Sequence, residues 1–163
     1  MMIKTIFTFS LFFLLFSSII HAQDFRLGGG LGYGTVIKNI GVNFRGDVKF
    51  GKQWSITPHF NWFFNKNKGP ITLRWNAFNV DGHYYFEIDQ TWTIYPIFGV
   101  NIATVSEKEN SITFSNSDVG INLGFGSEYN FDRRLSGFGE IKYVISDADQ
   151  AVITLGILYQ INK

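Results

Sequence analysis

The sequence predicts an all-β protein, an eight-stranded antiparallel up-and-down transmembrane β-barrel. Apolar and polar residues alternate along almost every segment after Asp24, and no window of helical length there repeats apolar residues with a helical period. The alternating segments number eight, each near the ~9–11 residues with which a tilted strand crosses a bilayer. Bulky apolar residues share one face of these segments, and glycine and charged residues share the other. These observations indicate a single domain of strands.

Composition excludes several classes of protein. The chain has 163 residues, no cysteine, 17 glycines and 18% aromatic residues. Without cysteine it has no disulfide framework, no thiolate metal site, no cysteine nucleophile and no lipid anchor on an N-terminal cysteine. Its 14 basic and 13 acidic side chains form no basic block, so we expect no nucleic-acid partner.

Residues 1–22 have the layout of a secretory signal peptide. Lys4 precedes an apolar run that begins at Ile6, and a small residue, Ala22, precedes the expected cleavage point. A transmembrane anchor needs about 20 apolar residues, and this run is shorter and contains Thr8 and several serines. We therefore expect residues 1–22 to be removed and residues 23–163 to form the barrel domain.

The strands follow from the alternation, taken in chain order. The segments 40–50 and 119–130 separate most cleanly into an apolar and a polar set. The same pattern predicts eight strands in all: 25–34, 40–50, 54–64, 73–86, 92–103, 119–130, 135–145 and 151–161.

Two features weaken the pattern. Pro58 and Pro96 lie inside strands, where each removes a ladder N–H, and predict bulges or local register breaks. Arg74, Asn76 and Asn79 blur the alternation of 73–86, so the upper half of that strand is expected to be loop.

The connections alternate between short and long. Short turns are expected at 51–53, 87–91 and 131–134, whereas the other end of the barrel carries 35–39, 65–72, 104–118 and 146–150. Outer-membrane barrels have short periplasmic turns and longer extracellular loops. An even number of strands then places both chain ends on the periplasmic side.

Side-chain volume decides which face meets lipid. The interior of an eight-stranded barrel is only just wide enough for side chains to fill it. The apolar set is bulky: Phe44, Phe50, Phe60, Trp62, Phe64, Phe98, Phe125, Tyr143 and Tyr159. The other set is rich in glycine: Gly28, Gly30, Gly32, Gly34, Gly41, Gly99, Gly120, Gly124, Gly126 and Gly156. The bulky set therefore faces outward, and so extensive an apolar surface requires lipid, although a soluble lipocalin-like binder stays an alternative.

The tryptophans predict two aromatic belts. Trp54 and Trp92 open strands at the short-turn end, and Trp62 and Trp75 lie at the long-loop end. Tryptophan prefers the level of the lipid headgroups, because its ring is apolar and its N–H needs a partner.

A polar network is expected to fill the lumen. Its predicted members are Arg45, Asp47, Lys49, His59, Asp81, His83, Glu128, Glu140 and Lys142. With Arg26, the inward face carries four cations and four anions, and unpaired charge there would cost several kcal/mol. Arg45 and Glu140 fall at similar depth and are predicted to pair across the lumen. A plugged lumen is the main interpretation, and a narrow pore for small solutes or ions is the alternative.

The end of the chain carries a family resemblance. Thr154, Gly156, Tyr159 and Ile161 fit the assembly signal of outer-membrane barrels, with Ile161 in place of the usual final aromatic residue. With the segments 26–34, 96–101 and 120–146, the sequence resembles the small OmpA/OmpX-like, porin-like outer-membrane β-barrel domains over essentially all of 24–163. The resemblance implies an outer-membrane location and two partners, the membrane lipids and the barrel-assembly machinery.

No enzyme, metal site or cofactor is expected. His59 and His83 are the only histidines after residue 22, and Ser55 shares the face of His59 but lies well below it. Asp81 and His83 share a face, but two ligands do not make a metal site. A lipid-modifying enzyme is thus a minor alternative. An extracellular ligand, which the sequence does not identify, would bind loops 65–72 and 104–118, giving a structural or surface-interaction role.

Overall fold

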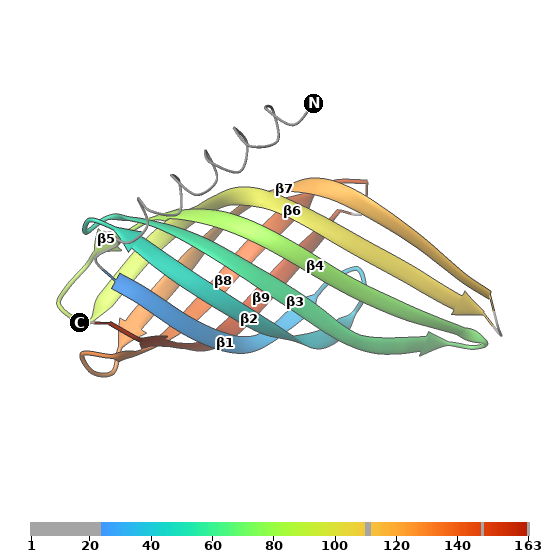
Figure 1. Cartoon of the computed structure of the whole chain (residues 1–163), viewed down its shortest axis with the longest axis horizontal. Helices are drawn as coiled ribbons and strands as arrows, with labels where there is room; N and C mark the ends of the chain where they lie inside the picture. The colour runs from blue at the N-terminus through green and yellow to red at the C-terminus, as the bar shows by residue number, and fades with distance from the viewer. Residues whose placement is uncertain (1–23, 110–111, 148, 163) are drawn as a thin grey trace, which may run out of the picture.

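The computed structural model describes residues 24–109, 112–147 and 149–162, and the predicted signal peptide lies outside them. Figure 1 shows long strands wound around one axis. Their bounds are β1 Asp24–Gly34, β2 Asn39–Phe50, β3 Trp54–Lys68, β4 Ile71–Tyr84, β5 Phe86–Glu87, β6 Trp92–Glu109, β7 Ile112–Asn130, β8 Leu135–Ile145 and β9 Gln150–Gln160. No helix among the described residues is long and apolar enough to cross a membrane.

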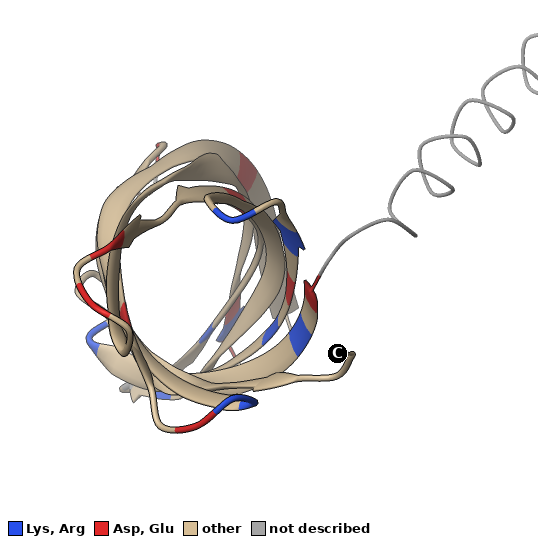
Figure 2. Ribbon diagram, turned by 90° about the vertical axis from the view of Figure 1, so that its left-hand side faces the viewer, with Lys and Arg blue, Asp and Glu red and all other residues tan. Residues whose placement is uncertain are grey.

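The strands close into an eight-stranded antiparallel barrel, which confirms the predicted fold class. The order is β4-β3-β2-β1-β9-β8-β7-β6-β5, and pairing between β4 and β6 closes the ring (Figure 2). The short β5 continues β4 along the same partner: β4 pairs His83 with Ile97, and β5 pairs Phe86 with Ile94 in an unchanged register. β4 and β5 thus form one of the eight strands of the barrel.

The prolines interrupt hydrogen bonding without shifting the register, so the predicted bulges are wrong. Pro96 falls opposite Tyr84 in the β4–β6 register, at the break between β4 and β5. Pro58 lies where the β2–β3 ladder omits pairs, and the pairs on either side keep one register. Each proline lacks an N–H, and each still pairs in register with its other neighbouring strand. Among the described residues, the register shift lies in β3, between Phe63 and Lys66.

Four neighbouring strands rise above the rest of the barrel. β3, β4, β6 and β7 have 15, 14, 18 and 19 residues, against 11 or 12 in β1, β2, β8 and β9. Their far ends extend beyond the other strands in Figure 1. We call this extension the arm, and define it as residues 64–68, 71–76, 104–109 and 112–118.

The arm corrects three expectations. Most of the predicted loop 65–72 is strand, because β3 and β4 leave only a turn at Gly69 and Pro70. Most of 104–118 is likewise paired between β6 and β7. The upper half of the fourth strand is also strand, and not loop. These segments were expected to be loops because they are rich in polar residues. An antiparallel strand with one face in water also carries polar residues, so their composition does not separate the two.

The short-turn end is stabilised by aspartates. Asp89 accepts hydrogen bonds from the backbone N–H groups of Thr91 and Trp92, at 2.7 and 2.8 Å. Asp132 accepts from those of Arg134 and Leu135, at 2.6 and 2.8 Å. These bonds favour the charged carboxylates and lower the pKa of Asp89 and of Asp132 below the usual range.

Stability should therefore fall in acid through these two turns. A carboxylate whose pKa is depressed in the folded state stabilises the fold above its unfolded pKa of about 3.9. That contribution is lost as the pH falls through the folded pKa. We expect the double variant D89N/D132N to show a smaller drop in the urea midpoint between pH 6 and pH 3 than wild type. The control E87Q should keep the wild-type drop, and equal drops in all three proteins would refute the prediction.

Candidate functional site

The lower part of the lumen, nearest the short turns, is built around Arg26. Its guanidinium donates to Glu128, to Asp47 at 3.1 Å and to the Tyr85 hydroxyl at 3.1 Å. The same Asp47 oxygen accepts from Tyr85 and from Thr57, each at 3.1 Å. β1, β2, β3 and β7 each contribute one of these residues, and Tyr85 lies between β4 and β5. The polar contacts therefore join opposite sides of the barrel.

The middle of the lumen holds the pair predicted from the sequence. Arg45 on β2 donates from both terminal nitrogens to the two carboxylate oxygens of Glu140 on β8, each at 2.6 Å. Tyr95 donates to the same carboxylate at 3.0 Å, and the Arg45 guanidinium lies 3.9 Å from the centre of the Phe138 ring. Both charged side chains are buried. A bidentate ion pair of this kind fixes the relative orientation of the two side chains and also neutralises their charges.

A second buried centre surrounds Lys142. Its Nζ lies 2.9 Å from Asp81, 3.0 Å from His59 and 3.1 Å from the amide oxygen of Asn79. The His59 ring also lies 2.9 Å from Asp81, and Asn122 donates to that carboxylate at 2.6 Å. Strands β3, β4, β7 and β8 meet here.

The two other predicted network residues lie at the edge of these centres. His83 is buried and stacks on Tyr95, with ring centres 4.7 Å apart. Its Nδ1 lies 3.4 Å from both Thr57 and Tyr85. Lys49 is half-buried, and its Nζ lies 4.6 Å from the centre of the Tyr85 ring. The structure thus places all nine predicted residues on the inner face.

An apolar layer above this network was not predicted. It consists of Ile37, Phe63, Leu73, Trp75, Ala77, Ala103, Val144 and Val152. Ile37 reaches it from the β1–β2 turn and is 1% exposed. We call this layer the ceiling, because it lies directly above the polar network, and Leu73 and Trp75 extend it into the base of the arm.

Trp75 belongs to the ceiling, so its placement in an aromatic belt is wrong. It is 4% exposed and pairs with Phe63 and Val105, both of which also face inward. The spacing predicts this position: Trp75 lies an even number of residues before the inward-facing Asp81, and side chains alternate along a strand, so both lie on the inner face.

Both lumen histidines are enclosed by the polar network. His59 and His83 are 3% and 1% exposed, and their polar contacts are to other network residues. Across the described ranges, no group of three or more His, Cys, Asp or Glu side chains has the arrangement of a metal site.

Three predicted belt residues face outward. Trp54, Trp62 and Trp92 are 49%, 53% and 44% exposed. Trp54 packs edge-on against Tyr84, and Trp92 against Tyr129. On β6 the outward apolar face runs from Trp92 to Ile102, and ten steps of about 3.3 Å at a tilt of about 40° give about 25 Å, the height of an outer-membrane apolar band.

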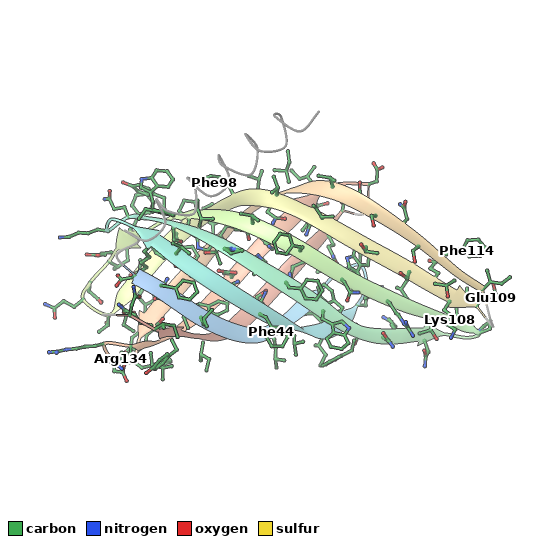
Figure 3. All side chains as sticks on the ribbon, in the orientation of Figure 1. Phe44, Phe98, Lys108, Glu109, Phe114 and Arg134 are labelled. Atoms are coloured by element: carbon green, nitrogen blue, oxygen red, sulfur yellow. The ribbon has the colours of Figure 1, made fainter. Side chains whose placement is uncertain are left out.

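The predicted assembly signal alternates in the same way on β9. Thr154 is buried, and Gly156 points inward, where a Cβ would meet the Phe138 ring at 2.6 Å. Tyr159 and Ile161 are about half exposed on the outer side. Figure 3 shows the same outward projection for Phe44 and Phe98.

The arm reverses this distribution. On the outer face, the apolar row Phe78–Ile102–Val119 is followed directly by the polar row Asn76–Thr104–Ser117. On the inner face, the next rows upward hold the apolar side chains Trp75, Val105, Leu73, Phe114, Ile71 and Ile112, together with Asn116, Glu107 and Glu109. The exchange of polar and apolar faces marks the level at which the outer surface leaves the lipid.

Solved structures share this architecture. Ail of Yersinia pestis has a TM-score of 0.65 and 15% identity, covering 85% of this chain and 98% of its own. The N-terminal β-barrel domain of Pseudomonas aeruginosa OprF gives 0.72 and 9%, covering 85% and 97%. Neisserial surface protein A gives 0.70 and 8%, covering 83% and 96%. Ail has also been crystallised with the heparin analogue sucrose octasulfate. At these identities the likeness shows the fold.

The family assignment rests on the sequence. No curated protein matches the chain. The family described as outer membrane protein beta-barrel domain matches residues 9–160, which is most of the chain. That match, the closed barrel and its apolar outer surface locate the protein in the outer membrane of a Gram-negative-type cell. The chain therefore belongs to the outer membrane protein β-barrel domain family.

Proposed function

We propose that this protein is a non-conducting barrel that holds the arm outside the cell as a surface for interaction. The observation that carries the proposal is the arm itself. Four strands continue past the lipid level as a paired sheet whose outer face, apart from Phe64, is polar, and whose inner face carries apolar side chains beside Glu107 and Glu109. A barrel without a role outside the membrane would not need these four strand extensions.

Two layers support a plugged lumen. The polar network pairs three cations, Arg26, Arg45 and Lys142, with four anions, and the ceiling fills the lumen above it with apolar side chains. An ion would have to displace buried ion pairs and then cross an apolar layer, and both steps are costly. The burial of both lumen histidines, with His59 held against Asp81 and Lys142, supports a role without catalysis.

The exposed part of the arm's inner face supports the interaction role. Ile112 and Phe114 are 60% and 68% exposed, beside the acidic Glu107 and Glu109. Phe114 and Glu109 project near the tip in Figure 3. Exposed aromatic side chains on a rigid sheet suit binding, since little entropy is lost on contact. Ail, which has the same fold, binds a sulfated sugar, and that likeness supports an extracellular ligand here as well.

The orientation is part of the proposal. The start of β1, the end of β9 and the short turns lie at one end of the barrel and the arm at the other (Figure 1). Outer-membrane barrels keep their short turns in the periplasm, so we place the arm outside and the termini in the periplasm. We further propose that residues 1–22 are removed on export, and that Thr154, Gly156, Tyr159 and Ile161 guide insertion by the barrel-assembly machinery.

Planar-bilayer recording tests the plug. Folded protein added to both chambers should give no steady conductance steps in 1 M KCl, whereas the alternative of a narrow pore predicts stable unitary steps. Heat-denatured protein in the same detergent controls for leakage. Reproducible steps from the folded form alone would refute the plugged lumen.

A further inference from the structure

The outer face of the arm carries charge of one sign. Arg74 on β4 and Lys108 on β6 point outward, and no acidic side chain shares that face in the described parts of the arm. The arm's acids, Glu107, Glu109 and Asp118, belong to the inner rows. Both basic side chains are exposed, and neither pairs with an acid among the described residues. The outer face is therefore a cationic surface next to the membrane.

The two cations lie close enough to act together. Arg74 pairs with Ser106, so Lys108 is its diagonal neighbour across the β4–β6 ladder. The Cα atoms of such neighbours are about 7–8 Å apart. Both line a shallow hollow of about 510 Å³, together with Asn65, Asn67, Pro70 and Thr72. The planar guanidinium can bind phosphate through two parallel hydrogen bonds, and a lysine adds a mobile charge.

A second hollow connects this cationic surface to the lipid belt. It has a volume of about 460 Å³ and is lined by Phe60, Trp62, Asn65, Arg74 and Asn76. Phe60 and Trp62 belong to the outward apolar surface, and Trp62 pairs with Asn76 in the first polar row. The hollow is thus apolar on its membrane side and cationic on its aqueous side. Its complement is a molecule with an acyl chain below and an anionic head above.

We propose that this outer face, made of Phe60, Trp62, Asn65, Arg74, Asn76 and Lys108, binds a phosphorylated lipid of the outer leaflet. Arg74 and Lys108 hold the phosphate, the asparagines bond the neighbouring polar groups, and the two aromatic rings pack along the first part of an acyl chain. The binding steadies the arm at the membrane surface. The inference goes beyond the proposed interaction role, which concerns the inner face and the tip.

The test uses the full barrel in phosphatidylcholine nanodiscs, where orientation in a cell plays no part. Diphosphorylated lipid A is added, and native mass spectrometry counts the lipid molecules retained by the protein. The variant R74Q/K108Q removes both charges. The control K52Q/R133Q removes two exposed charges at the opposite end, which carry no ion pair among the described residues. Heat-modifiable migration in gels checks that every variant is folded.

We expect wild type and K52Q/R133Q to retain lipid A equally, and R74Q/K108Q to bind it at least about tenfold more weakly, since charge-assisted hydrogen bonds are lost. Dephosphorylated lipid should bind all three proteins as weakly as the variant binds lipid A. Equal retention by wild type and R74Q/K108Q would overturn the proposal. Displacement of lipid A by millimolar inorganic phosphate would overturn the lipid assignment in favour of a free anion. A conducting barrel would refute the plug and leave this result unaffected.

Discussion

Replacement of Glu140 by alanine is expected to lower the free energy of unfolding by about 3–5 kcal/mol, the typical cost of breaking a buried ion pair on one side. The substitution leaves the Arg45 guanidinium in the lumen without the two carboxylate oxygens that now lie 2.6 Å away. It also leaves the Tyr95 hydroxyl without its acceptor. Urea unfolding in lipid vesicles, followed by tryptophan fluorescence, measures the loss.

Two controls separate the ion pair from general damage. The double variant R45M/E140L replaces the pair with apolar side chains of similar size, and should recover most of the stability lost in E140A, because no charge is left unpaired. The variant E87A removes an exposed acid and should change the free energy by less than about 0.5 kcal/mol. If E140A unfolds at the wild-type urea midpoint, the pair does not stabilise the barrel as described.

Replacement of Gly30 by alanine is expected to destabilise the barrel by about 3 kcal/mol, at the upper end of overpacking effects. Gly30 points into the lumen from β1, and a Cβ there would overlap the carbonyl oxygen of Leu155 and lie 2.7 Å from the Cα of Gly156. Both are backbone atoms of the neighbouring strand. Relief would require β1 and β9 to move apart, and so would weaken their ladder.

Gly32 provides a matched control on the same strand and face. A Cβ at this position would have its nearest neighbour 3.6 Å away, at the Thr154 hydroxyl, which is ordinary contact. G32A should therefore be neutral or slightly stabilising, since alanine loses less backbone entropy than glycine. The shift from folded to unfolded gel migration with rising urea compares the two variants. Equal midpoints would show that close backbone approach does not explain the glycine-rich inner face.

The lipid-facing part of the fold could be predicted because two patterns agreed. Alternation identified the strands, and side-chain volume then decided which face was outside. Arg45 and Glu140 fell at similar depth on opposite strands, and a balanced lumen requires such pairs. These inferences needed only strand geometry and the narrowness of an eight-stranded barrel.

The ceiling and the arm could not be predicted in the same way, because both reverse the rule. Trp75 and Phe63 are bulky and apolar, yet they face inward above the lipid level. Arg74 and Asn76 are polar and face outward on a regular strand. If the apolar face is taken to be the same along the whole strand, these positions are assigned to the aromatic belt or to a loop. The sequence does contain a sign of this exchange. Between Phe78 and Asn76 the outward positions change from apolar to polar, while the inward positions become apolar at Ala77 and Trp75.

Cysteine labelling in intact cells tests most directly whether the arm stands outside the cell above a lipid-embedded barrel. The chain has no cysteine of its own, so single substitutions report cleanly. With a membrane-impermeant maleimide, Ser106→Cys on the arm should react in intact cells. Phe98→Cys, in the apolar belt, should stay unlabelled, and Lys52→Cys, in a short turn, should react only after the outer membrane is opened. Labelling of Lys52→Cys but not Ser106→Cys in intact cells would contradict the orientation, and ready labelling of Phe98→Cys would contradict the lipid belt.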